Sequence, residues 1–172
     1  MSAEYWIEKL DLLPHPEGGF YREVYRCCES CDARSLPGRF GADRAFSTAI
    51  YFLLQAGDFS AFHRIKSDEI WHHYDGGDLE IISIPPNGDL QKVILGKHSP
   101  EARPMVIVPH GSWFAARLSP GQGYVLCGCT VAPGFDFADF EMAARAELVR
   151  HFPQHAGVIG QLTRRGNPAT PP

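Results

Sequence analysis

The sequence predicts an all-β domain, an antiparallel sandwich or barrel with a short helix at each end. The main observation is a series of eight short apolar runs, separated by turns rich in Gly, Pro, Asn and Asp. The second is the helical spacing of apolar residues near both ends of the chain. The third is that no linker divides the chain, so a single domain is expected over residues 1–172.

The first elements precede the barrel. Tyr5 to Leu13 has helical spacing and is expected to form a short helix that Pro14 stops. The segment PEGGFYREVYR predicts a strand. Residues 27 to 46, which contain many Cys, Ser, Gly, Pro and Arg, predict a long surface loop.

The barrel core is expected at about residues 47–133. Its eight predicted strands are STAIYFLL, FSAFHRI, EIWHHYD, LEIISIP, LQKVILG, MVIVP, WFAARL and YVLCGCTVA. After Pro133 the spacing changes to helical, with acids early and arginines late, which suits a helix dipole. We therefore expect a C-terminal helix at about 136–152 and a flexible tail at 164–172.

Composition and charge exclude several classes of partner. With 16 Lys and Arg against 20 Asp and Glu and no basic stripe, nucleic-acid binding is not expected. The apolar runs are short and the N-terminus is acidic, so no membrane segment is expected and the chain reads as cytoplasmic. Five cysteines cannot pair completely, and Cys27, Cys28 and Cys31 are expected to be loop thiols whose role the sequence leaves open.

The stretch GDFSAFHRIKSDEIWHHYDGG carries the candidate catalytic residues. Strand alternation places Glu69 and His73 on one face, and a hairpin between the two flanking strands would bring His63 opposite them. A histidine and a carboxylate that converge inside a barrel provide either metal ligands or an acid/base pair.

The spacing of these residues resembles the first signature motif of the cupin superfamily. Gly57, His63, Glu69 and Gly76 are in register, whereas Ile65 replaces the second histidine of the motif.

The second cupin motif is also incomplete. Pro109, His110 and Gly111 match it, but Phe114 stands in its histidine position. A divalent metal held by His63, Glu69 and His73 therefore remains the alternative. The apolar replacements favour a metal-free organic pocket without a cofactor.

The chain resembles more narrowly a small single-domain branch, the fifth cupin family, long catalogued as a domain of unknown function. The matching segments are LLPHPEGGFYREVYR, STAIYFLL, FHRIKSDEIWHHY, VPHGSWFAARL and GCTVAPGFDFADFE. The resemblance implies a cupin double-stranded β-helix, or jelly-roll barrel, and a homodimer. It also implies a pocket like that of metal-independent epimerases of nucleotide-linked deoxy-keto-sugars.

Further residues are candidates for ligand binding. They are Tyr51, Ser60, Arg64, Lys66, Trp71, Phe114, Tyr124 and Cys127. The tyrosines could act as phenolic acids, Arg64 and Lys66 could anchor phosphate at the rim, and Cys127 could line the barrel. The segment HPEGGFYRE could fold over a partner barrel and supply Glu17 and Tyr21, although loop packing also explains its glycines.

The sequence thus predicts a cupin that binds a small molecule, with isomerase or epimerase chemistry on a sugar derivative, a nucleotide sugar or a sugar phosphate. In that chemistry His63 removes a proton next to a carbonyl, and Glu69 or His73 orients it. Two alternatives stay open: a non-catalytic ligand-binding barrel, and a metal-dependent sugar-phosphate isomerase or dioxygenase.

Overall fold

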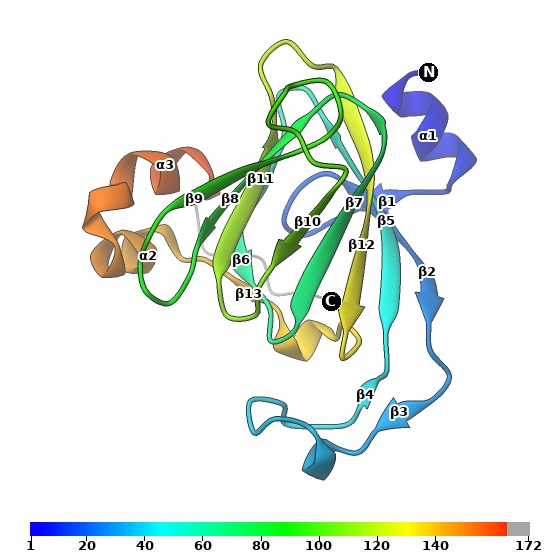
Figure 1. The fold of residues 1–172 in the computed structure, drawn as a ribbon, viewed down its shortest axis with the longest axis vertical. Coiled ribbons are helices and arrows are strands. Elements are labelled where there is room, and N and C mark those ends of the chain that lie inside the picture. Colours follow the sequence, from blue (N-terminus) through cyan, green and yellow to red (C-terminus); the bar gives the residue numbers. More distant parts are fainter. Residues whose placement is uncertain (165–172) are drawn as a thin grey trace.

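Two antiparallel sheets form a barrel in the computed structural model, which describes residues 1–164 (Figure 1). The first sheet contains, in order, β1 (Leu13–Pro14), β2 (Phe20–Arg26), β5 (Thr48–Gln55), β12 (Tyr124–Ala132), β7 (Asp68–Gly76) and β10 (Met105–Val108). The second contains β13 (Glu141–Met142), β6 (Phe59–Arg64), β11 (Trp113–Leu118), β8 (Leu79–Ile84) and β9 (Gln91–Leu95). All eight predicted barrel strands are present, which confirms the fold class.

Strands β6 and β7 do not form the hairpin that the sequence suggested. They belong to different sheets: β6 pairs with β11, and β7 pairs with β12 and β10. Strands β5, β6, β7 and β8 alternate between the two sheets, so His63 and Glu69 line the space between the sheets from opposite sides.

The N-terminal helix α1 (Ala3–Lys9) ends earlier than the predicted Leu13. The Ser2 hydroxyl accepts a hydrogen bond from the Tyr5 backbone N–H and caps its start. The helix packs its apolar residues over the outer face of β5 and β12. Leu13 is instead drawn into strand β1, where it pairs with Tyr21.

The segment predicted as a loop at 27–46 leaves the barrel as an arm (Figure 1). It contains two short paired strands, β3 (Ser30–Cys31) and β4 (Arg44–Ala45), and the 3₁₀ turn η1 (Ala33–Ser35). Cys27, Cys28 and Cys31 are free thiols.

The predicted C-terminal helix at 136–152 is wrong over its first half. Residues 136–144 form the 3₁₀ turn η2 (Phe137–Asp139) and strand β13. Tertiary contacts override the helical spacing there, because Phe137 and Phe140 turn toward the barrel cavity. The chain becomes helical only at α2 (Arg145–His151).

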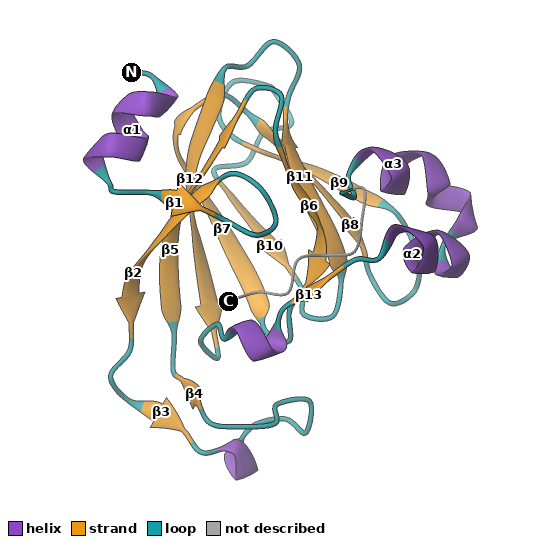
Figure 2. Ribbon diagram, turned by 180° about the vertical axis from the view of Figure 1, so that it is seen from behind, coloured by secondary structure: helices purple, strands orange, loops and turns teal. Residues whose placement is uncertain are grey.

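Helix α2 is followed by the 3₁₀ turn η3 (Pro153–His155) and α3 (Ala156–Gln161). Figure 2 shows these helices on the outer side of the second sheet, where Leu148 and Ile159 are buried. Of the tail predicted at 164–172, residues 165–172 lie outside the described part. Arg164 forms an ion pair with Asp58, with 2.6 Å between Nη2 and Oδ1.

Candidate active site

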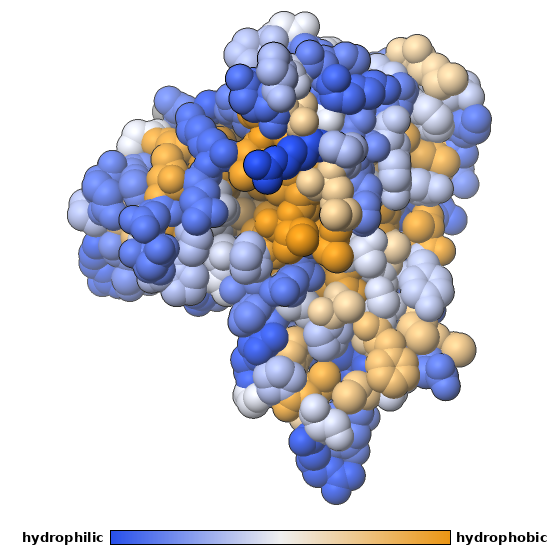
Figure 3. Space-filling model, viewed as in Figure 1, coloured by the Kyte–Doolittle hydropathy of each residue, from blue (hydrophilic) through white to orange (hydrophobic). Residues whose placement is uncertain are grey.

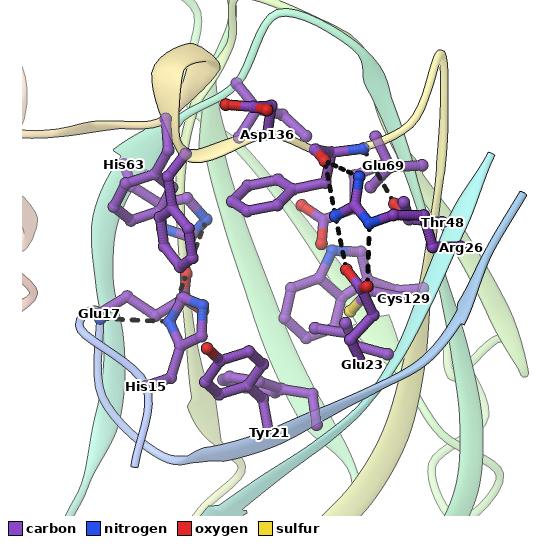
Figure 4. Close-up of a pocket in the computed structure, with 18 residues that line it drawn as sticks. His15, Glu17, Tyr21, Glu23, Arg26, Thr48, His63, Glu69, Cys129 and Asp136 are labelled. Carbon is purple, nitrogen blue, oxygen red and sulfur yellow. Dashed lines mark hydrogen bonds and ion pairs between the residues drawn. The ribbon is translucent and has the colours of Figure 1, made fainter. Parts of the chain in front are cut away.

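A cavity of about 430 Å³ lies between the two sheets at the end of the barrel near η2. This volume suits a small organic ligand. Its charged and titratable lining residues are His15, Glu17, Glu23, Arg26, His63 and Glu69, together with Asp136. Its aromatic wall consists of Tyr21, Phe52, Trp71, Phe135, Phe137 and Phe140. Figure 4 shows His15, Glu17 and His63 on one side of the cavity, and Glu69, Cys129, Glu23 and Arg26 on the other.

His63 is fixed through both ring nitrogens. Its Nδ1 lies 2.7 Å from the carbonyl oxygen of Ala61. A carbonyl only accepts, so Nδ1 carries a hydrogen and donates it. The neutral ring therefore presents the lone pair of Nε2 to Glu17 Oε2, 3.2 Å away. Two acceptors at this distance need a proton between them.

Glu17 is the centre of this group. Its Oε1 accepts a hydrogen bond of 2.8 Å from the Ser60 hydroxyl. Its Oε2 lies 3.4 Å from His15 Nδ1 as well as 3.2 Å from His63 Nε2. The backbone N–H of Glu17 donates to His15 Nδ1 at 3.3 Å, which leaves that nitrogen unprotonated.

Burial decides where the shared proton resides. It lowers the pKa of His63 to about 4, against a smaller opposing effect of the Ala61 carbonyl. Burial also raises the pKa of Glu17, although His15 and Ser60 oppose the rise. It lowers the pKa of His15 too. Of the two groups, Glu17 therefore holds the shared proton, and its carboxyl group donates to neutral His63.

Glu69 is a second protonated acid across the cavity. Burial raises its pKa to about 8, and the nearby Glu17 adds to the rise. The thiol of Cys129 and the indole of Trp71 face the carboxyl and oppose it. The cavity thus holds an acid on each side and little net charge.

Arg26 and Glu23 are partly exposed lining residues that form an ion pair beside the cavity. Arg26 at the end of β2 binds both carboxylate oxygens of Glu23, at 3.0 and 2.7 Å. It also donates to the carbonyl oxygen of Phe135 at 3.1 Å. These contacts join β2 to the segment before η2.

His73 does not join His63 and Glu69. It lies in phase with Glu69 on β7, but four residues along a strand correspond to about 13 Å. Its Nε2 instead lies 3.1 Å from the carbonyl oxygen of Gly77, toward the other end of the barrel. Strand alternation predicts which face of the sheet a residue lies on, but it does not predict which residues along that face line the cavity.

Two of the predicted ligand-binding residues, Tyr51 and Tyr124, lie away from the cavity. Both pack in the cluster beneath α1 on the outer face of the sheet. The Tyr124 hydroxyl donates to Asp75 at 2.6 Å. Neither phenol can reach a ligand bound between the sheets.

Three others have supporting positions. Ser60 binds Glu17 and does not line the cavity. Phe114 is buried against His63, with 4.1 Å between ring centroids. Cys127 is buried in the barrel core and its thiol faces the Phe52 carbonyl oxygen, whereas Cys129 lines the cavity. Of the predicted set, only Trp71 is itself a wall of the cavity.

Arg64 and Lys66 are engaged outside the cavity. Arg64 Nε binds Glu141 at 2.7 Å, and Lys66 Nζ binds Asp139 at 3.1 Å. Their positive charges are already paired. A phosphate at this rim would have to compete with those carboxylates.

The segment HPEGGFYRE covers the barrel of its own chain. It brings His15, Glu17 and Tyr21 to the cavity instead of lending them to a partner barrel. Gly18 has φ 117°, and a Cβ there would collide with the carbonyl of Phe59, so this close approach requires glycine. The double glycine in the sequence was the signal for this close approach. The sequence did not show which barrel the segment covers, or that His15 lines the cavity.

The donor set does not fit the metal centre of a typical cupin. Ile65 and Phe114 occupy two ligand positions, and Phe114 packs on the His63 ring. Within residues 1–164, no group of three or more His, Cys, Asp or Glu is placed to hold a metal ion.

Comparison with known families agrees with this barrel. The family described as Cupin superfamily (DUF985) matches residues 4–143. The chain belongs to this cupin family. No curated protein matches it. A crystal structure of a protein from Shewanella oneidensis is 37% identical, with a TM-score of 0.86, and the match covers 96% of this chain and 99% of that one.

Other solved structures show how far the likeness extends. A protein from Leishmania major is 34% identical, with a TM-score of 0.87, over 96% of this cupin and 100% of that chain. Oxalate decarboxylase from Bacillus subtilis is only 14% identical, with a TM-score of 0.55, over 91% of this chain and 38% of that one. That resemblance shows the fold alone. The family and the cavity together support a small-molecule-binding cupin. No helix within residues 1–164 is long and apolar enough to cross a membrane.

Proposed function

We propose that this cupin is an isomerase or epimerase that moves a proton next to a carbonyl group of a sugar derivative. The observation that carries the proposal is the group formed by His15, Glu17 and His63, in which a buried carboxyl group faces two imidazole nitrogens. Glu69, protonated near neutral pH, supplies an acid on the opposite side.

The proton moves through Glu17. The proton on Oε2 passes to Nε2 of His63, and the carboxylate formed in this way takes the proton from the substrate carbon. The substrate then carries one negative charge, as an enolate, and His63 is an imidazolium. Return of a proton to either carbon or face of the enolate regenerates the neutral pair. The role expected for His63 from the sequence is thus shared with Glu17.

The test is incorporation of deuterium from heavy water into the carbon next to the carbonyl. A panel of nucleotide-linked deoxy-keto-sugars and sugar phosphates is incubated with the wild type, Glu17→Gln and His63→Asn. Both variants are expected to lose about 10²- to 10⁴-fold in exchange rate, the usual contribution of general acid–base catalysis.

Matched controls separate chemistry from surface effects. Glu141→Gln and His151→Asn change an exposed acid and an exposed histidine outside the cavity, and should exchange at the wild-type rate. Ligands that raise the melting temperature without any exchange in the wild type would indicate a non-catalytic binding barrel.

The metal-dependent alternative has its own measurement. Metal content is determined in protein purified without an affinity tag, for the wild type and Glu69→Gln. Near-stoichiometric metal that disappears in the variant would replace the metal-free proposal. Equal, negligible metal in both would support it.

A homodimer is part of the proposal. Figure 3 shows an apolar area on the face where β7 and β10 lie. On edge strand β10, Met105 and Ile107 are 51% and 55% exposed. Pairing of this face with a second copy would cover them. Sedimentation of the wild type and of Ile107→Lys tests it, since the variant should be monomeric.

A further inference from the structure

The indole of Trp71 is a buried donor at the wall of the cavity. The residue is 1% exposed, and its Nε1 has no hydrogen-bond partner within residues 1–164. An unsatisfied buried N–H carries a desolvation cost that a hydrogen-bond acceptor removes. It therefore needs either a structural partner or a ligand.

The carboxyl group of Glu69 is a polar neighbour of this indole, and its protonated form offers a donor O–H. The indole N–H acts on this carboxyl as a donor and lowers its pKa, but the contact does not meet hydrogen-bond geometry and leaves the N–H unsatisfied. The two residues are two positions apart on β7 and line the same cavity. Together they place an indole N–H and a carboxylic O–H in the wall of the cavity.

Resting on the proposed function, we infer that Trp71 and Glu69 form a binding site for the carbonyl oxygen of an uncharged α-hydroxycarbonyl group. The Glu17 base lies on the other side of the cavity (Figure 4), where the adjacent carbon would face it. Two donors on the oxygen stabilise the negative charge that develops when that carbon loses its proton.

The described lining of the cavity offers no free cation to an anion, which favours an uncharged group. Glu17, Glu23, Glu69 and Asp136 line it, whereas Arg26 is the one lysine or arginine among the described lining residues. Arg26 is already bound to Glu23 and to the Phe135 carbonyl. A carboxylate or phosphate on the Trp71 side would meet acids without a free cation.

The experiment follows the indole N–H signals in ¹⁵N–¹H spectra near neutral pH. The chain has three tryptophans, and Trp6→Phe and Trp113→Phe assign the Trp71 signal by elimination; both residues pack outside the apolar cluster that contains Trp71. The ligand is glycolohydroxamic acid, an uncharged mimic of an enediol. Glycolate serves as its anionic counterpart.

Glycolohydroxamic acid is expected to shift the Trp71 signal downfield and to leave those of Trp6 and Trp113 in place. Trp71→Phe and Glu69→Leu should each weaken binding by about 3- to 10-fold, the value of one hydrogen bond. Glu69→Gln, which keeps a donor, should lose less. The Trp71 shift is read in the wild-type indole, so it remains decisive if a core variant fails to fold.

Three results would overturn the inference: no binding, binding without a shift of the Trp71 signal, or tighter binding of glycolate. The proposed function fails separately. A Trp71 shift without deuterium exchange on any substrate would support the carbonyl-binding site and contradict the proposed role of Glu17 as a base. Deuterium exchange without a Trp71 shift would support the proposed function and contradict the carbonyl-binding site.

Discussion

Two sets of buried acids lie close to η2 and differ in whether a cation is paired with them: Asp139 is one set, and Glu17 and Glu69 are the other. Asp139 receives two hydrogen bonds from Arg44, at 2.6 and 2.7 Å, and an ion pair from Lys66. Within residues 1–164, neither the Glu17 nor the Glu69 carboxyl group pairs with a lysine or arginine; their partners are Ser60, histidines and Cys129. The first set is a complete ion pair, and the second has no cation to keep it ionised.

The pKa shifts record this difference. Burial by itself would raise the pKa of Asp139, but the hydrogen bonds from Arg44 and Lys66 bring it below the ordinary value. Burial without a cation raises the pKa of Glu17 and Glu69. Asp139 therefore anchors η2 to the arm, whereas the cavity acids keep protons that a reaction can use.

The largest effect is expected from breaking the buried ion pair. Arg44→Leu leaves Asp139 buried with Lys66 alone, and should lower the free energy of unfolding by about 3–5 kcal/mol. Denaturant unfolding measures it. Arg34→Leu, which breaks the exposed pair with Asp32, is the matched control and should leave the free energy of unfolding nearly unchanged. Equal losses in the two variants would contradict the comparison.

The next effect concerns the pH dependence of stability. The pKa of Glu69 is about 8 when folded and 4.5 as a free side chain. Between these values the folded state holds a proton that the unfolded state has lost. Stability from this group is therefore lost as pH rises, by up to about 1.4 kcal/mol per pH unit.

Glu69→Gln should remove that loss. Between pH 5 and pH 8, the free energy of unfolding should depend less on pH in the variant than in the wild type. Asp139→Asn is the opposite case. Because the pKa of Asp139 is lower in the folded state than in the unfolded state, this carboxylate stabilises the folded protein at pH values above its unfolded pKa, and the stabilisation is lost in acid. Identical slopes for Glu69→Gln and the wild type would mean that Glu69 is ionised when folded.

The smallest effect distinguishes support of the site from support of the fold. Ser60→Ala removes the hydrogen bond to Glu17 Oε1 and should cost about 1 kcal/mol. Ser67→Ala removes a comparable bond to the Pro133 carbonyl and should cost as much. Only Ser60→Ala should raise the pKa of Glu17 further, as measured by carboxyl NMR titration. A shift in both variants, or in neither, would contradict the assignment.

The sequence by itself predicted the barrel and half of the site. Period-two alternation between Gly- and Pro-rich turns is a local property, so the eight strands were readable. His63 and Glu69 were found because a motif preserves their separation along the chain. Trp71 followed from sharing a face with Glu69.

Only the tertiary structure decided which residues meet at the cavity. His73 shares the face of Glu69 but lies too far along the strand, and Phe137 and Phe140 left a helical pattern to wall the pocket. Glu17 reaches His63 from 46 positions away, through a loop that a double glycine lets pass close to β6. Alternation and spacing describe neighbours along the chain, whereas the proton shared by Glu17 and His63 depends on burial and distance, which arise only when the sheets close.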